Sequence, residues 1–459
     1  MYRFALDHLE RWKKKPNRKP LVIRGGRQVG KSFLVRMFAK EKFENICEVN
    51  LERHPASGSL FESNDPRTIL NLLEARFGGK IQPGKTLLFL DEIQSAPGVL
   101  GSLRYFHEEL PELHVISAGS LLEFALEEPA FSMPVGRIEY LHLGPMQFEE
   151  FLLALDKGGL HRFLCEYSPA QKIPAAIHGE LTNLLRQFLI VGGLPEAVAL
   201  FAKTHSYRDC DEVKESILAT YRDDFNKYGR LVRQDRVEKI FSKIPLMVGN
   251  RFKYSHVDRE ERSKDLQAAL RLLSLAKVAV PVCHSSANGI PLGAEKNNRI
   301  FKVLFLDVGL LCKSCGLGAL EIEKAEDLLL VNAGSVCEQF VGQHLLYAGS
   351  PFEEPELYFW VREEKNSNAE VDYLFTAGSR IIPVEVKSGK SGSMKSLQLF
   401  LREKKILSAV RFDANPPSVL RTQTSLSAGT NVPFELISLP LYAVGQLRRL
   451  TFLTNVQLT

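Results

Sequence analysis

The stretch that decides the fold is PLVIRGGRQVGKSFLVRMFAK, residues 20–40. It reads as an apolar strand over residues 20–24, a loop matching G-x-x-x-x-G-K-S over residues 25–32, and a helix over residues 32–40. Glycines let backbone N–H groups close around phosphate oxygens, and the helix N-terminus adds a partial positive charge. Lys31 would reach the β- and γ-phosphates, and the Ser32 hydroxyl would bind Mg²⁺. This order of strand, loop and helix predicts a nucleoside triphosphate site.

The second element of such a site is TLLFLDEIQ, residues 86–94. A buried strand ends there in two acids, and ligands bind at that edge of open α/β sheets. We expect Asp91 to hold Mg²⁺ and Glu92 to orient or deprotonate the attacking water. The residues expected to contact the nucleotide are Gly25, Gly26, Arg27, Gln28, Val29, Gly30, Lys31, Ser32, Phe33 and Ser120.

Two further residues are candidates, each with an alternative role. Ser120 follows a third strand, LHVISAGS, residues 113–120. Its hydroxyl can sense the γ-phosphate or cap the next helix. Arg137 precedes another apolar strand and can stabilise transition-state charge, either in the same chain or in a neighbouring subunit. A surface ion pair is the alternative for Arg137.

Residues 1 to about 155 resemble the AAA+-type ATPase domain of a large prokaryotic family. The segments that carry the resemblance are RKPLVIRGGRQVGKS, LLFLDEIQ, ISAGSLLEF and VGRIEYLHLGPMQFEEFL, and VGGLPEAV (191–198) is similar to a further family box. The resemblance implies a parallel-sheet P-loop NTPase that binds and hydrolyses ATP with Mg²⁺. The family motif often ends in Gly-Lys-Thr, and Ser32 is chemically equivalent.

The middle of the chain has mainly helical patterns. Residues 156–230 are expected to form a helical lid, and residues 231–295 resemble the winged-helix segment of the same family. A winged helix can place its second helix in a DNA major groove. Arg262, Lys264 and Arg271 would then contact DNA. The alternative is a scaffold that binds a protein partner.

A third stretch, AEVDYLFTAGSRIIPVEVKSG, spans residues 369–389. Strand alternation predicts that Val371 and Tyr373 face the core and that Asp372 faces away from it. A four-residue loop at 377–380 would set Asp372 opposite Glu385. Facing carboxylates repel each other unless a cation lies between them, and Lys387 or a metal ion would supply that charge.

Residues 296–459 resemble the same family's C-terminal domain, a DUF4143-like domain similar to PD-(D/E)xK nucleases. The resemblance implies metal ligands at Glu338, Asp372 and Glu385, with Glu385 and Lys387 in catalysis. A second Mg²⁺ or Mn²⁺ would polarise a phosphoryl oxygen and activate water there. The same fold also serves as a platform that does not cut.

Composition narrows the class of protein. The 459 residues are 45% hydrophobic and 25% charged with a net charge of +5, which permits nucleic-acid binding without requiring it. No apolar run approaches a membrane span, the N-terminus is too charged for a signal peptide, and the scattered cysteines suit reduced thiols in the cytoplasm. The predicted division is an ATPase core (1–155), a lid (156–230), a winged helix (231–295) and a nuclease-like domain (296–459).

Three functions fit this α/β organisation. One is an ATPase whose nucleotide state controls a nuclease acting on DNA. Another is an ATP-driven switch that holds nucleic acid or a protein without cutting. The last is a signalling ATPase that assembles as a homo-oligomer, with Arg137 acting on the neighbouring subunit.

Overall fold

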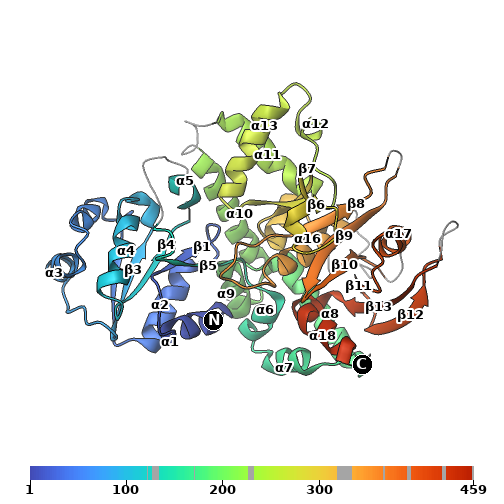
Figure 1. The fold of residues 1–459 in the computed structure, drawn as a ribbon, viewed down its shortest axis with the longest axis horizontal. Coiled ribbons are helices and arrows are strands. Elements are labelled where there is room, and N and C mark those ends of the chain that lie inside the picture. Colours follow the sequence, from blue (N-terminus) through green and yellow to red (C-terminus); the bar gives the residue numbers. More distant parts are fainter. Residues whose placement is uncertain are drawn as a thin grey trace. The chain divides into compact units, whose positions relative to one another are not determined.

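The computed structural model describes residues 1–120, 122–126, 134–169, 171–225, 232–317, 333–364, 367–389, 394–425 and 431–456. The chain divides into two compact units (Figure 1). The N-terminal unit comprises Met1–Pro145, Leu275–Val278 and Gly349–Pro355. The C-terminal unit comprises Met146–Ser274, Ala279–Ala348 and Glu356–Thr459. Both units combine helices with a sheet, which confirms the predicted α/β class.

A parallel sheet of five strands forms the centre of the N-terminal unit, in the order β2-β3-β4-β1-β5. Every residue of β3 and β4 is buried, as expected for a parallel sheet covered on both faces. Because β4 lies between β1 and β3, the loops that follow these strands meet at one edge of the sheet. The strands are β1 (Leu21–Arg24), β2 (Asn45–Asn50), β3 (Thr86–Asp91), β4 (His114–Ala118) and β5 (Glu139–His142).

Helices connect these strands, and their starts are specified locally. Asp65 caps α3 by accepting hydrogen bonds from the N–H groups of Arg67 and Thr68, and Pro66 fills the first helical position. Apolar side chains of α3 and α4, among them Leu73 and Phe106, pack in one cluster with β3. The helices are α1 (Ala5–Lys14), α2 (Lys31–Lys42), η1 (Pro55–Phe61), α3 (Pro66–Phe77), η2 (Ile93–Ser95), α4 (Val99–Glu109) and α5 (Leu122–Leu126).

The C-terminal unit contains a tight junction built on glycines. Asp307 Oδ2 accepts a 2.7 Å hydrogen bond from the N–H of Gly193, and Asp307 Oδ1 caps a helix through the N–H groups of Gly309 and Leu310. A Cβ atom at Gly192, where φ is +82°, would lie 2.2 Å from Asp307 Oδ1. The VGGLPEAV segment is therefore a packing junction with the LDVGL segment (306–310).

The helices α6 to α13 precede the first strand of this unit, and further helices follow that strand along the chain. Figure 1 shows α11, α12 and α13 close to one another, near β6 and β7. The helices are α6 (Phe148–Ala154), α7 (Gly158–Glu166), α8 (Ala175–Val191), α9 (Pro195–Thr204), α10 (Tyr207–Asp224), α11 (Gln234–Met247), α12 (Tyr254–Val257), α13 (Ser263–Leu275), η4 (Leu292–Glu295), α14 (Val308–Ser314), α16 (Ala333–Leu346), α17 (Lys395–Lys404), η5 (Leu441–Gln446) and α18 (Leu447–Val456).

A mixed sheet of eight strands completes the unit, in the order β12-β13-β11-β10-β9-β8-β6-β7. The pairs β10–β11, β11–β13 and β6–β8 are parallel, and the remaining pairs are antiparallel. The strands are β6 (Ala279–Ser285), β7 (Lys296–Phe305), β8 (Tyr358–Val361), β9 (Glu370–Ala377), β10 (Arg380–Val386), β11 (Ser408–Asp413), β12 (Ser418–Gln423) and β13 (Pro433–Pro440).

The pattern of faces expected for β9 holds in part, because Val371 and Tyr373 are both buried but contact different neighbours. Val371 packs in the cluster that contains Phe400 of α17, whereas the Tyr373 hydroxyl donates a 2.8 Å hydrogen bond to the carbonyl of Glu338 on α16. The pairing of β8 with β9 shifts register across this region, so strict alternation fails. Asp372 and Tyr373 thereby both approach residues of α16.

The β9–β10 turn is shorter than expected. Ala377 pairs with Arg380, so the turn has two residues, with φ of +61° at Gly378. The register continues through Tyr373 opposite Val384, and it brings Asp372 next to Glu385 as the sequence indicated.

The segment expected to be a winged helix contains α11, the short α12, α13 and β6, in that order. The strands β6 and β7 pair antiparallel, and β6 also pairs with β8, so both belong to the eight-stranded sheet. The division of the chain into four segments stays a prediction. All seven cysteines are free thiols. Among the described residues, no helix is long and apolar enough to cross a membrane.

Candidate functional site

The loop between β1 and α2 has the backbone that a phosphate cradle needs. Gly25 has φ of +154°, and a Cβ atom there would lie 2.2 Å from the carbonyl oxygen of Leu143. Gln28 and Gly30 have φ values of +65° and +88°, in the left-handed region. Such a run of unusual conformations turns successive N–H groups toward one point, where an anion can bind.

Lys31 is buried, with 6% of its surface exposed. Its ammonium group donates hydrogen bonds to the carbonyls of Gly25 and Gly26, at 3.1 and 2.8 Å. Burial lowers the pKa of Lys31 to about 8, although the nearby carboxylates of Glu92 and Asp91 act in the opposite direction. Among the described residues its hydrogen bonds go to these carbonyls, and a buried cation in such a place gains greatly from an anionic ligand such as a triphosphate.

Ser32 and Asp91 form the adjoining part of the site. The Ser32 hydroxyl donates a 2.8 Å hydrogen bond to Asp91 Oδ1, and the Asn50 amide donates to Asp91 Oδ2 at 3.3 Å. Burial raises the pKa of Asp91, while the bond from Ser32 opposes that rise. Hydroxyl and carboxylate oxygens are the ligands that Mg²⁺ prefers, so this pair fits the expected metal ion.

Glu92 is held in a strained conformation beside Asp91. Its backbone is left-handed, with φ of 51° and ψ of 48°, which costs about 1 kcal/mol or more for a residue with a side chain. Gln94 donates a 2.6 Å hydrogen bond to Glu92 Oε2, and the Ser120 hydroxyl lies 3.4 Å from the same oxygen. Three loops, after β1, β3 and β4, thus bring the expected residues together at the sheet edge.

Two of the expected residues have exposed side chains. Arg137 forms a 2.6 Å ion pair with Glu108 of α4 and is 45% exposed, which is the surface pair named as its alternative. Phe33 is 54% exposed on the first turn of α2. A role for Arg137 in a neighbouring subunit stays a prediction.

In the C-terminal unit, the expected acids gather around a lysine that the sequence analysis missed. Lys302 of β7 is 2% exposed, and its ammonium group lies 3.2 Å from Glu338, 2.6 Å from Glu370 and 3.7 Å from Asp372. Burial opposes the charge of Lys302, but these carboxylates raise its pKa well above the usual value. Burial also raises the pKa of Glu338.

Glu385 and Lys387 lie next to this group. The Lys387 ammonium is 2.5 Å from Glu385 Oε1, and the N–H of Val386 donates a 2.8 Å hydrogen bond to Asp372. Glu385 Oε2 is buried and has no hydrogen-bond partner among the described residues. Burial, followed by the Asp372 carboxylate, raises the pKa of Glu385 to about 7.

These acids do not fit a second metal ion in this arrangement. Among the described parts of the chain, no three His, Cys, Asp or Glu side chains are placed to hold one. Lys302 occupies the point where Glu338, Glu370 and Asp372 converge. Of the two carboxylates expected to face each other, Glu385 is paired with Lys387, as the sequence indicated, and Asp372 lies 3.7 Å from Lys302.

Lys302 and Glu370 each left a signal in the sequence, whereas Asn50 did not. Lys302 is a lone lysine in the apolar segment IFKVLFL (300–306), where a charge has to find partners. Glu370 lies two residues before Asp372 on the same strand. Asn50 ends β2 at the sheet edge, although nothing in the sequence alone shows that β2 pairs with β3.

Three segments of the chain match models of known protein domains. Residues 17–152 match the model of an AAA domain, residues 182–321 that of a domain of unknown function, DUF8612, and residues 333–441 that of a domain of unknown function, DUF4143. No curated protein matches this chain.

Several solved structures are similar at low identity. The Walker-type ATPase PABY2304 of Pyrococcus abyssi is 15% identical with a TM-score of 0.42, and the alignment covers 68% of this chain and 95% of that one. PCH-2 of C. elegans is 12% identical with a TM-score of 0.26, covering 45% and 63%. The predicted resemblance is confirmed at the level of domains: the chain contains an ATPase-like P-loop domain that matches the AAA model and a C-terminal segment that matches DUF4143.

Proposed function

We propose that this chain binds and hydrolyses ATP with Mg²⁺, and that its nucleotide state controls a C-terminal nuclease-like domain that acts on DNA. The observation that supports this best is the convergence of Lys31, the Ser32–Asp91 pair and Glu92 at one sheet edge. A phosphate cradle, a pair of oxygen ligands and a carboxylate held for proton transfer are what phosphoryl transfer to water requires.

Each of these residues would have its own role in hydrolysis. Phosphate oxygens replace the carbonyls of Gly25 and Gly26 on Lys31, and their charge raises the pKa that burial has lowered. Ser32 and Asp91 would hold Mg²⁺ through their oxygens, and the ion would supply positive charge beside the phosphates. Glu92, held by Gln94 and Ser120, orients a water molecule and accepts its proton.

Phosphate release from ATP tests the hydrolysis. Wild-type protein is compared with Lys31→Ala, which removes the phosphate-binding cation. The control is Lys40→Ala, an exposed lysine on the same helix. Loss of ATP binding and turnover in Lys31→Ala alone supports the proposal, whereas equal rates in all three proteins contradict it.

The C-terminal domain has two candidate functions, which are cleavage of DNA and binding of DNA without cleavage. Asp372, Glu385 and Lys387 lie together as a hydrolytic site needs, and one oxygen of Glu385 has no partner in the described structure. The observation that favours binding without cutting is Lys302, which takes the position a metal ion would need. The choice between cleavage and binding therefore depends on whether a metal ion can displace the Lys302 ammonium group.

A cleavage assay separates these candidates. Plasmid and single-stranded DNA are incubated with Mg²⁺ or Mn²⁺, with and without ATP. The variants are Lys387→Ala, Lys31→Ala and the control Lys395→Ala, an exposed lysine at the start of α17. Cutting that only Lys387→Ala abolishes supports a nuclease, and a change with ATP that Lys31→Ala removes supports control by nucleotide. Absence of cutting in an active ATPase leaves the binding switch.

The proposal also includes a homo-oligomer in which Arg137 of one subunit acts at the ATP site of its neighbour. If Arg137 acts on the neighbouring subunit, the ATPase rate per chain rises with protein concentration, and Arg137→Ala lowers it. A rate independent of concentration contradicts that role. A protein partner and a cytoplasmic location stay predictions.

A further inference from the structure

A buried arginine near the start of the chain contacts the phosphate loop. Arg3 precedes α1 and is 4% exposed. Its guanidinium group donates a 2.9 Å hydrogen bond to the carbonyl of Val29 and another of 2.9 Å to the carbonyl of Gly144. Val29 belongs to the phosphate loop, and Gly144 follows β5. Arg3 lies 26 residues before Val29, outside the phosphate-binding motif.

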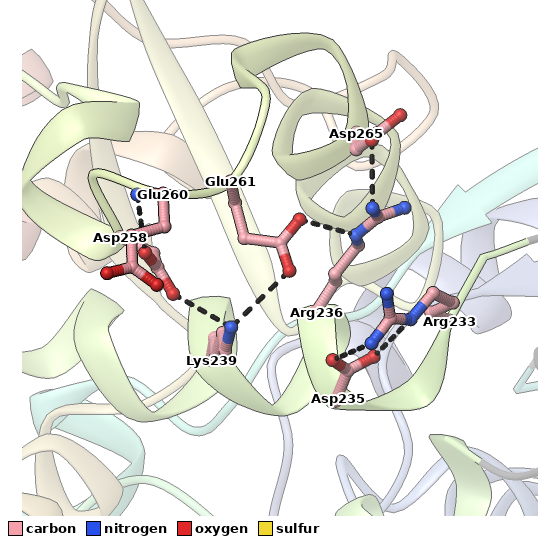
Figure 2. A network of polar contacts seen from close by, with 8 residues as sticks. All are labelled: Arg233, Asp235, Arg236, Lys239, Asp258, Glu260, Glu261 and Asp265. Carbon is pink, nitrogen blue, oxygen red and sulfur yellow. Dashed lines mark hydrogen bonds and ion pairs between the residues drawn. The ribbon is translucent and has the colours of Figure 1, made fainter.

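An arginine can join two separate segments because its planar fork carries several N–H donors. Figure 2 shows such a link on α11, where Arg236 contacts Glu261 at 2.8 Å and Asp265 at 2.9 Å. The acceptors in that network are side-chain carboxylates. Arg3 instead donates to two main-chain carbonyls. Its hydrogen bonds therefore fix the course of the backbone itself.

Holding the carbonyl of Val29 also sets the direction of the next N–H group. A trans peptide is planar, so its C=O and N–H groups point in opposite directions. The hydrogen bond from Arg3 to Val29 therefore directs the N–H of Gly30 away from Arg3. Gly30 is the N-cap of α2 and one of the residues expected to contact the nucleotide. Its N–H group is thus oriented by a residue outside the loop.

The peptide that follows is oriented by the helix. The N–H of Leu34 donates a 2.9 Å hydrogen bond to the carbonyl of Gly30. By the same geometry, the N–H of Lys31 points toward the N-terminal end of α2. Two successive N–H groups are thus fixed in direction, the first by Arg3 and the second by the helix. Such N–H groups at a helix N-terminus bind phosphate.

The segment after β5 supports both ends of the phosphate loop. A Cβ atom at Gly25 would lie 2.2 Å from the carbonyl oxygen of Leu143, so the start of the loop packs directly on this segment. The end of the loop, at Val29, is joined to the same segment through Arg3 and Gly144. Arg3 is therefore the link at the second end.

We propose that Arg3 is a positioning residue for nucleotide binding. It holds the Val29–Gly30 peptide in the direction that a phosphate oxygen needs, before the nucleotide arrives. Binding then costs less backbone freedom, which raises the affinity for ATP. The inference rests on the proposed binding of ATP and adds to that site a residue that the phosphate-binding motif does not contain.

The expected result of losing Arg3 is weaker binding with little change in turnover. The nucleotide itself would then have to order the loop, so ATP should bind about tenfold more weakly, as loss of hydrogen bonds from a charged group would give. Once ATP is bound, its phosphates hold the loop, and turnover at saturating ATP should stay within about twofold of wild type. A residue that acts in the chemical step, such as Glu92, would give the opposite result.

Titration with a fluorescently labelled ATP, together with phosphate release, tests the inference on the full chain. Arg3→Met removes the hydrogen bonds to both carbonyls but keeps a long apolar side chain. Arg3→Lys keeps the charge, but a single ammonium group replaces the planar fork. The control is Arg11→Met, at an exposed arginine of α1. Thermal unfolding without nucleotide shows whether each variant folds.

The outcomes separate this inference from the proposed function. Weaker ATP binding in both Arg3 variants, with turnover at saturating ATP kept and Arg11→Met unchanged, supports the positioning role. Wild-type affinity in Arg3→Lys overturns the link between the two carbonyls, and this variant decides alone if Arg3→Met does not fold. A fall in turnover with unchanged affinity also overturns the positioning role. Wild-type protein that binds no ATP overturns the proposed function itself.

Discussion

Ser32 and Asp91 lie 59 residues apart in the sequence and are joined by a 2.8 Å hydrogen bond. Ser32 lies in the first turn of α2, which follows β1, whereas Asp91 ends β3, and β4 lies between these two strands. The sheet order therefore places Ser120, which follows β4, between the phosphate loop and the two acids. Its hydroxyl lies 3.4 Å from Glu92.

Glu92→Gln should separate nucleotide binding from hydrolysis. The amide keeps the shape of the side chain but cannot accept a proton, so we expect turnover to fall by about 10²–10⁴-fold with little change in ATP affinity. Phosphate release and binding of a labelled nucleotide measure the two effects. Glu112→Gln, an exposed acid of the same unit, should behave as wild type. An equal loss of affinity and turnover would show that Glu92 acts in binding.

The N-terminal site could be predicted almost residue by residue because its chemistry is local. Lys31 and Ser32 follow the turn that positions them, and Asp91 and Glu92 follow the strand that carries them. Asn50 escaped prediction since its contact with Asp91 depends on the pairing of β2 with β3. Pairing between distant strands leaves no signal in either strand alone.

Gly192→Ala should destabilise the C-terminal unit. Its Cβ atom would lie 2.2 Å from Asp307 Oδ1, and φ is +82°. Strain and displacement of Asp307 together should cost about 3 kcal/mol. Denaturant unfolding measures the loss. The control is Gly179→Ala within α8, where a Cβ atom meets nothing within 4 Å. It should stabilise the helix by up to about 1 kcal/mol, and equal effects of both substitutions would contradict the junction.

The C-terminal site was predicted less completely because tertiary packing decides it. Asp372, Glu385 and Lys387 were found from their spacing along a hairpin, and the structure brings them together. The register shift between β8 and β9 depends on neighbouring strands and could not be foreseen. The contacts of Lys302 likewise join β7 to α16 and β9.

Glu149→Gln should change how stability depends on pH. Burial raises the pKa of Glu149 on α6 to about 7, so the folded chain keeps a proton that the unfolded chain releases. Stability therefore falls as pH rises from about 4.5 to about 7, by about 1.4 kcal/mol per unit. Glutamine removes this loss, so the variant should be more stable at about pH 8, by on the order of 3 kcal/mol, and similar to wild type near pH 4.

Thermal unfolding across this pH range checks the Glu149 prediction. Glu196→Gln, an exposed acid of α9, should follow the wild-type curve. A Glu149→Gln variant that is less stable than wild type at both ends of the range would show that the ionised carboxylate makes favourable contacts.

Lys302→Met should destabilise the protein strongly near neutral pH. The substitution leaves the partly buried Glu338, Glu370 and Asp372 together without their cation, and loss of the partner of a fully buried charge typically costs about 3–5 kcal/mol. The loss should shrink on acidification, because protonated carboxyls no longer repel one another. Denaturant unfolding at neutral and acid pH measures the difference, with Lys296→Met on the exposed end of the same strand as control.

If Mn²⁺ restores the midpoint of Lys302→Met but leaves wild type unchanged, then these acids hold a metal ion once the lysine is gone, and Lys302 is what excludes it. A loss no larger than that of Lys296→Met would contradict the central place of Lys302 among these acids.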